Sequence, residues 1–497
     1  MKKYILMISV ALTLSGFNSC SDRDLELLPP NGDLLDAVNT ASKLQMFLTN
    51  AYLSIGDVSA LGNDVMLFGD VLGDKIYNTP SRSVFLLTYN YTFSADQNQF
   101  KFYRSMYDVI LSCNMVINNT KVPQTPEVVQ MKGEAKILRG IAYYYLVSYY
   151  SPTPASGVNQ EFGVPLVLND YDVTIQPARA TVSQVYDQII ADLNDGIAHT
   201  HTPTKKVFVG PDAAKIVLSR LYLTRRAPGD AELALQYATD VKNHAPMGDI
   251  NAATNSGSFV SNNSSQYGSA DYQKYWVNQN DAIYEGHGET IWEIDMSTSS
   301  NPVMNIGSNG ALPVYYSVGD ATRRCILANA TFYNSIPATD IRRGGNINTG
   351  LFSTIGNNIG DTTPGYWVNK YPRTTSTGNF NRNIRIFRYS EAELLRIEAL
   401  RLTNPTAALS ELNAFASARK GTSYSGTNLL DDILTEKSKE FFSEGQRFLD
   451  LKRYGLPVHR PSNCTTCDVQ GDDYRFVLPI TRTALNNNAN LKQYPGY

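Results

Sequence analysis

Cysteine is scarce in this sequence, and several short motifs that mark enzyme sites are missing. The 497 residues include five cysteines. No His-Glu-x-x-His, Gly-x-Ser-x-Gly or P-loop pattern occurs, so common signatures of zinc proteases, serine hydrolases and nucleotide-binding enzymes are lacking. We therefore expect a protein that is not an enzyme and needs no cofactor or metal. A surface glycoside hydrolase is the alternative, because its two carboxylates leave no short motif.

An excess of charge of one sign is also missing. The chain has 43 basic and 46 acidic residues, and its formal net charge is −3. It contains neither a basic stripe that would attract nucleic acid nor an acidic block typical of a disordered tail. We expect no nucleic-acid partner. Tyrosine, in contrast, is abundant at 31 residues, and its apolar ring with a polar tip suits helix packing as well as contacts with sugars or peptides.

Long apolar runs are absent after residue 20, so no membrane-spanning helix is predicted there. The N-terminus has a shorter run, from Ile5 to Leu14, which follows the basic residues Lys2 and Lys3. A short apolar run behind positive charges is typical of a secretory signal peptide. We assign residues 1–19 to such a signal.

Cys20 follows the segment Gly16-Phe17-Asn18-Ser19. A small residue directly before a cysteine, at the end of the apolar run, is the pattern of a bacterial lipoprotein signal, in which the signal is removed and the thiol is acylated. Phe17 and Asn18 depart from the usual pattern, so a plain signal peptide with its cleavage site near Cys20 is the alternative. We predict lipidation at Cys20, with residues 20–38 as a polar, proline-containing tether.

Apolar residues recur at helical spacing through most of the remaining chain. Helix pairs of about 34 residues, joined by turns such as Pro228-Gly229 and Asn404-Pro405, indicate tetratricopeptide-like stacking. We predict a mainly α fold, a tetratricopeptide-like helix-pair scaffold. The predicted helices cover residues 42–53, 99–119, 127–150, 181–198, 211–226, 230–243, 389–402, 406–420 and 429–454.

The sequence changes character between these helical parts. It becomes rich in Asn, Ser, Gly and aromatic residues, with short extended runs such as 290–296. Long loops of this kind commonly carry function. The predicted division is a helical part at 39–245, an irregular loop-rich subdomain at 246–385 that is the candidate ligand-binding region, and a second helical part at 386–497.

Several segments together resemble one family, the SusD/RagB-like outer-membrane lipoproteins of the Bacteroidetes. The strongest match is the segment from Glu444 to Gly455, which follows Glu436 and Glu440. Lys437 stands where the family usually has Arg, and Ser390 stands where Ala is common. The other matching segments, in chain order, are 20–30, 133–139 with 143–147 and 163–166, 180–193, 340–342, 388–399, 478–480 and 493–497.

The resemblance implies a SusD-like fold and a non-catalytic protein on the cell surface. Such a protein would be anchored by lipid in the outer membrane, would capture a glycan or sometimes a peptide, and would pass it to a SusC-like TonB-dependent transporter beneath it. A peptide-binding member of the family and a structural or adhesive lipoprotein are the alternatives.

Sugar binding would use flat aromatic faces with polar side chains at the rim. For each single residue, packing in the core is the more frequent role of an aromatic side chain. Trp276 is the first choice, because its neighbours along the chain are polar. The candidate ligand-binding residues are Trp276, Tyr275, Tyr284, Tyr315, Tyr316, Trp367, Asp74 and Tyr77.

Cys464 and Cys467 form a Cys-x-x-Cys pair in a polar segment. In an oxidising compartment we expect a local disulfide, and a redox or zinc site is the alternative. The sequence predicts buried, unreactive thiols at Cys113 and Cys325.

Overall fold

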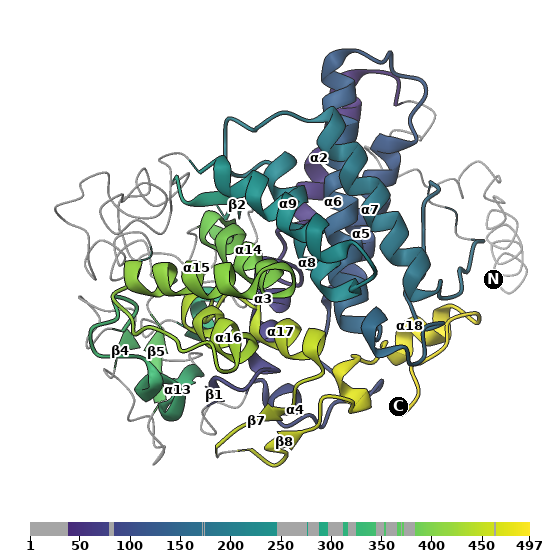
Figure 1. The fold of residues 1–497 in the computed structure, drawn as a ribbon. Coiled ribbons are helices and arrows are strands. Elements are labelled where there is room, and N and C mark those ends of the chain that lie inside the picture. Colours follow the sequence, from purple (N-terminus) through teal and green to yellow (C-terminus); the bar gives the residue numbers. More distant parts are fainter. Residues whose placement is uncertain are drawn as a thin grey trace, which may run out of the picture.

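Successive helices pack against one another along the chain and form the body of the protein (Figure 1). The computed structural model describes residues 38–78, 84–170, 172, 174–245, 276, 288–296, 312–316, 325–343, 352–353, 365–368, 370–371, 383–461 and 464–497. The predicted signal peptide, Cys20 and most of the tether lie outside these residues.

The N-terminal helices form a layered stack. Helix α2 (Ala41–Ile55) packs on α5 (Phe102–Ile117), α5 on α6 (Pro126–Tyr150), and α6 on α7 (Val182–His199). The stack continues through α8 (Pro211–Arg225) and α9 (Asp230–Asn243). These ranges agree with the predicted helices to within a few residues. The mainly α, tetratricopeptide-like fold is therefore confirmed.

The start of α7 shows how capping residues determine where a helix begins. Thr181 caps the helix: its side chain accepts a hydrogen bond from the Gln184 backbone N–H, and the Gln184 side chain accepts one from the Thr181 backbone N–H. This reciprocal pair satisfies backbone N–H donors that have no partner within the first turn of a helix.

A buried ion pair joins α7 to the helix before it. Arg139 of α6 donates two hydrogen bonds to Asp192 of α7, at 2.8 and 2.6 Å.

The C-terminal helices continue the stack. Helix α14 (Tyr389–Thr403) packs on α9, α15 (Pro405–Ala418) packs on α14, and α16 (Leu429–Glu440) packs on both. Helix α17 (Arg447–Tyr454) follows α16 and contacts α3 (Asp64–Val71) near the N-terminus. The two helical parts of the chain therefore share one apolar core.

The prediction of one helix over 429–454 is wrong. The structure ends α16 at Glu440 and begins α17 at Arg447. Between them, Ser443 and Gly445 have φ values of +63° and +73°, which a right-handed helix cannot contain. Gly445 also lies against α3, because a Cβ built on it would come within 2.6 Å of the Met66 Cα atom.

Short strands lie between the helical parts. A four-stranded antiparallel sheet has the order β1-β3-β5-β4, formed by β1 (Ile76–Asn78), β3 (Ile326–Asn329), β5 (Gly365–Val368) and β4 (Phe352–Ser353). Strand β2 (Thr290–Ile294) pairs with β6 (Ile384–Arg388), which leads directly into α14. Because β1 comes from the N-terminal part, the sheet ties that part to the segment predicted to be loop-rich.

Several short elements complete the described fold. Helix α4 (Leu86–Tyr89) follows β1, α12 (Leu312–Tyr316) and α13 (Ala330–Ser335) flank β3, and a two-stranded ribbon joins β7 (Val458–His459) to β8 (Asp468–Val469). The short 3-10 turns are Pro154–Ser156 and Tyr474–Phe476. The chain then ends with α18 (Arg482–Asn487), whose Arg482 N–H donates to the Ala95 carbonyl at 2.9 Å. The C-terminus therefore returns to the N-terminal helices.

A buried ion network lies where α16 meets the strands. Arg342, which is fully buried, contacts Asp340, Glu436 and Glu440 at 2.6, 2.7 and 3.2 Å. Arg388 of β6 contacts both Glu440 and Glu444, at 3.1 and 2.8 Å. Opposite charges at close range keep Glu440 ionised: although burial alone would raise the pKa of this carboxyl, three arginines and Lys370 hold it well below its ordinary value.

Candidate ligand-binding site

Trp276 is buried, contrary to the expectation of an exposed loop aromatic. Its exposed fraction is 0%. The Lys370 Nζ atom and the Arg385 and Arg388 guanidinium carbons lie 4.5, 4.9 and 5.1 Å from the centroid of its ring. The reason for preferring Trp276 as a ligand contact is therefore wrong. Its polar neighbours along the chain do not determine its surroundings in space, where cations and apolar residues cover the ring.

Three of the other predicted contacts are also core residues. Tyr77 and Trp367 form a small apolar cluster with Leu327 of β3, with exposed fractions of 3% and 0%. Tyr316 is fully buried, and its hydroxyl donates to Asp70 at 2.9 Å. These side chains hold the short strands and α12 in place and present no surface to a ligand.

Tyr315 and Asp74 are less enclosed, although both have partners. The half-buried Tyr315 ring packs edge-on against Phe85, with centroids 4.8 Å apart. Asp74 accepts two hydrogen bonds from Arg447, at 2.7 and 2.8 Å, and one from Lys75 at 3.1 Å. Burial would raise the pKa of Asp74, but the hydrogen bonds and charge of Arg447 hold it well below its ordinary range. Asp74 is thus a structural anion.

Two further predicted contacts, Tyr275 and Tyr284, lie outside the described residues and stay predictions. Cys464 and Cys467 are joined by a disulfide, with their Cα atoms 5.2 Å apart. They lie in the turn between β7 and β8, where the Thr465 N–H donates to the Asn90 side chain at 2.8 Å. Cys113 and Cys325 are buried free thiols.

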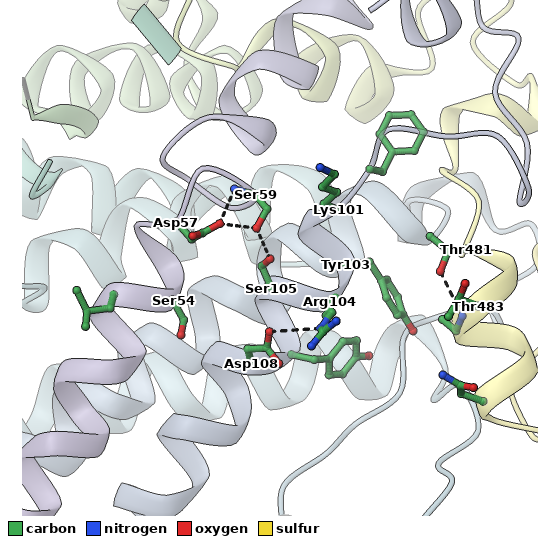
Figure 2. Close-up of a pocket in the computed structure, with 15 residues that line it drawn as sticks. Ser54, Asp57, Ser59, Lys101, Tyr103, Arg104, Ser105, Asp108, Thr481 and Thr483 are labelled. Atoms are coloured by element: carbon green, nitrogen blue, oxygen red, sulfur yellow. Dashed lines mark hydrogen bonds and ion pairs between the residues drawn. The ribbon is translucent and has the colours of Figure 1, made fainter. Parts of the chain in front are cut away.

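A large groove of about 1080 Å³ lies open between α2, α5 and α18 (Figure 2). We call it the α2–α5–α18 groove. Its lining comes from three distant parts of the chain. The residues that line it are Leu53, Ser54, Asp57, Ser59, Phe100, Lys101, Tyr103, Arg104, Ser105, Tyr107, Asp108, Thr481, Thr483, Ala484 and Asn487.

One wall of the groove carries a fixed polar group. The Ser59 N–H and hydroxyl both donate to Asp57 Oδ1, at 2.8 and 2.5 Å, and the hydroxyls of Ser59 and Ser105 lie 2.6 Å apart. Figure 2 shows Asp57, Ser59 and Ser105 together on this wall, while Thr481, the N-cap of α18, and Thr483 of α18 lie on the opposite side. The turn after α2 and the first turn of α5 position this group.

The opposite charges in the groove balance each other. Arg104 and Asp108, one helical turn apart on α5, form a loose ion pair with Nε and Oδ2 3.9 Å apart. Lys101 and Asp57 are the other charged lining residues. Partial burial raises the pKa of Asp108, an effect that Arg104 opposes and Asp57 reinforces.

Tyrosines and a leucine supply the apolar surface of the groove. Tyr103 and Tyr107 lie with their ring centroids 5.1 Å apart, and the Tyr107 hydroxyl donates to the Pro165 carbonyl at 2.9 Å. Leu53 is 42% exposed. The arrangement offers hydrogen-bonding groups beside ring edges and aliphatic carbon, which suits reversible binding of a polar ligand.

The sequence alone could not reveal this groove. The polar side of α5 has the pattern of any solvated helix face, and only the return of the C-terminus places Thr483 opposite Ser105. A weak signal was available in the polar residues Asp57, Ser59, Lys101 and Arg104, which flank the predicted helices at 42–53 and 99–119. However, nothing in their spacing ties them to residues 481–487.

Comparison with known proteins identifies the family. Residues 25–223 match the family described as "Starch-binding associating with outer membrane", and residues 327–497 match the family described as "SusD family". A SusD-like protein of Bacteroides ovatus is 25% identical over an alignment of 482 positions, which covers 91% of this chain and 82% of that protein. The chain belongs to the SusD/RagB-like family.

Solved structures of the SusD superfamily share the fold over nearly the whole chain. A SusD superfamily protein of Bacteroides thetaiotaomicron is 24% identical, with a TM-score of 0.76, covering 92% of this chain and 100% of its own. A protein of Bacteroides vulgatus described as a putative sugar binding protein is 24% identical, with a TM-score of 0.77, covering 93% and 99%. Surface glycan-binding protein A of Bacteroides uniformis is 19% identical, with a TM-score of 0.68, covering 91% and 99%.

Within the described ranges, the chain has neither a membrane-spanning helix nor a group of metal-ligating side chains. None of the helices there is long and apolar enough to cross a membrane. In that same part of the chain, no three His, Cys, Asp or Glu side chains are grouped closely enough to hold a metal ion.

Proposed function

We propose that this protein is a cell-surface lipoprotein that captures an oligosaccharide and delivers it to a SusC-like TonB-dependent transporter in the outer membrane. The observation that carries the proposal is the match of both halves of the chain to SusD-type families, one of which is described as starch-binding and associated with the outer membrane. Two proteins of the same fold are described as sugar-binding and glycan-binding.

The physical arrangement supports this function. A lipid on Cys20 would hold the domain at the membrane and raise its effective concentration at a transporter. The helix stack gives a rigid body, and the α2–α5–α18 groove is open to solvent. Binding and release require no covalent step, so we propose that the glycan leaves the protein unchanged.

We also propose that the chain divides at residues 245 and 385, as the sequence predicts. In this proposal the loop-rich segment between them supplies further ligand contacts, Tyr275 and Tyr284.

Two alternatives compete with glycan capture. A peptide-binding member of the family would share every feature of the fold. A structural or adhesive lipoprotein would share the anchor but would bind no soluble ligand. Both can be separated from the proposal by asking which class of molecule stabilises the folded domain.

The test is a thermal-shift screen of the mature chain, residues 21–497, against panels of oligosaccharides and peptides. A ligand that binds only the folded state stabilises it by about 2.7 kcal/mol at a concentration of 100 times Kd, which raises the melting temperature measurably. The proposal predicts a shift with at least one oligosaccharide. A shift with peptides alone would favour the peptide-binding alternative, and no shift with either panel would favour the structural one.

A further inference from the structure

We propose that the α2–α5–α18 groove is a glycan-binding site on the helical body, and that it takes a neutral oligosaccharide. This inference rests on the proposed function and adds a place and a ligand class to it. The place differs from the one that the sequence suggested, because the groove is built from helices at the two ends of the chain. None of the residues predicted as ligand contacts lines it.

The size of the groove fits an oligosaccharide. Its volume of about 1080 Å³ lies just above the range of about 300–1,000 Å³ that is typical of small-molecule sites. Four further cavities in the described part of the chain hold about 20 Å³ or less, which is room for a water molecule and not for a sugar. Among these sites, size alone favours the groove.

The charge of the groove favours a neutral ligand. Its lining contains two acidic and two basic side chains, Asp57 and Asp108 with Lys101 and Arg104. An acidic ligand would need an excess of positive charge, and a basic ligand an excess of negative charge, because an unpaired charge in a partly buried site is costly. A balanced lining meets neither need, whereas an oligosaccharide without uronate, sulfate or amino groups carries no charge that would need a partner.

The polar groups of the groove match hydroxyl groups. Within the described residues, the hydrogen bonds to the Asp57 carboxylate come from Ser59 and end on Oδ1, so Oδ2 keeps its capacity to accept from a ligand hydroxyl. Arg104 has a 91% exposed side chain and can donate to several oxygens. Thr483 and Asn487 on the opposite wall offer further donors and acceptors.

The apolar part of the lining completes this match. Leu53 and the half-buried Tyr107 lie beside these polar groups. A sugar ring has both hydroxyl edges and C–H faces, so it can use both kinds of surface at once. A loop of a partner protein could also lie in a groove of this size, and the experiment below includes that outcome.

The test is a substitution that fills the groove without touching the core. Thr483 is exposed on α18 and lines the groove, so Thr483→Trp should block it. Asn486→Trp on the same helix is the matched control, because Asn486 is exposed but does not line the groove. A third variant, Asp57→Asn, removes the charge but keeps an oxygen that can accept both hydrogen bonds from Ser59.

The measurement is isothermal titration calorimetry of the mature chain with neutral oligosaccharides (maltoheptaose, cellohexaose, xylohexaose and mannohexaose), with oligogalacturonate as an acidic comparison. We expect a neutral oligosaccharide to bind the native chain. Thr483→Trp should weaken that binding at least tenfold and Asp57→Asn several-fold, while Asn486→Trp leaves it unchanged and oligogalacturonate binds more weakly.

Unchanged binding of a neutral oligosaccharide to Thr483→Trp would overturn the groove as its site and leave the proposed function standing. If Thr483→Trp instead prevents the chain from co-purifying with its transporter while glycan affinity is kept, the groove is a protein-docking surface and the inference is wrong. Preferential binding of oligogalacturonate would overturn the neutral ligand class. If no oligosaccharide binds the native chain, both the proposed function and this inference fail.

Discussion

At the residue scale, the molecule buries many charged side chains and places them in contact with partners of opposite charge. Arg342, Arg388, Glu436 and Glu440 are almost fully buried and interlinked. Burying one unpaired charge would cost several kcal/mol, so the partners must be present together. The residues that identify the family are therefore mostly scaffold residues, and they reveal little about the ligand.

Trp276 offers a test of this account. Because its ring is fully buried under Lys370, Arg385 and Arg388, Trp276→Ala should destabilise the fold by about 3–5 kcal/mol. Trp276→Phe keeps an aromatic face for the cations and should recover part of that loss. Urea denaturation of the mature chain measures both effects. An unchanged unfolding midpoint for Trp276→Ala would show that the ring is a surface group after all.

Asp70 should make stability depend on pH. Burial raises the pKa of this carboxyl to about 7, although the Gly445 N–H and the Tyr316 hydroxyl favour the ionised form. The folded state therefore holds a proton that the unfolded state, with a pKa of about 3.9, releases. The stability that this group contributes is present below about pH 4 and is lost as the pH rises to about 7.

The comparison of the native chain with Asp70→Asn isolates this effect, since Asn can still accept both hydrogen bonds. The difference in free energy of unfolding, native minus variant, should fall with rising pH by up to about 1.4 kcal/mol per pH unit between these two pKa values. At pH values above the folded-state pKa, this difference should level off. Chemical denaturation of both proteins at a series of pH values measures it, and a difference that stays constant with pH would contradict the raised pKa.

At the element scale, helices were predictable where capping residues and apolar spacing agree. Thr181 caps α7 as expected, and Asp230–Asn243 was predicted to the residue. The strands β1 and β3 pair residues about 250 positions apart, such as Tyr77 with Leu327, and no local pattern reports such a contact. The break after Glu440 was also missed, because the charged residues on both sides keep a helical spacing through it.

Two glycines near this break allow a matched comparison. Gly445 and Gly455 both have positive φ, at +73° and +61°, but a Cβ on Gly445 would meet Met66 at 2.6 Å and a Cβ on Gly455 would meet nothing within 4 Å. Gly455→Ala should therefore cost about 1–2 kcal/mol from backbone strain alone. Gly445→Ala should cost about 2–5 kcal/mol, since overpacking adds to the strain. Equal losses in chemical denaturation would contradict the close approach of α3.

At the scale of the whole molecule, the sequence predicted the fold class and the family better than it predicted the site. Family motifs run along the chain in order, and the matches to residues 25–223 and 327–497 follow them. The candidate site needs the three-dimensional return of α18 to α5, which motifs do not encode. Aromatic residues in polar segments do not predict the ligand contacts, because the side chains of Trp276, Tyr316 and Trp367 are fully buried.

The proposed anchor gives a prediction for the intact cell. Cys20 is the proposed acylated residue, so Cys20→Ala should release the protein from the cell surface into the medium or leave it unprocessed. Surface proteolysis and fractionation of cells that express each form measure this. Cys113→Ala is the control, because that thiol is buried in the core and far from the tether in sequence. Surface retention of Cys20→Ala would count against the lipid anchor.

The central claim is that the mature chain binds an oligosaccharide and releases it unchanged. The most direct measurement has two steps. Residues 21–497 are first dialysed to equilibrium against an oligosaccharide that raises their melting temperature, and the recovered sugar is then analysed by chromatography. We predict saturable binding and a sugar of unaltered chain length. Shorter sugars in the recovered material would show that the protein is an enzyme, and the absence of saturable binding would contradict the account.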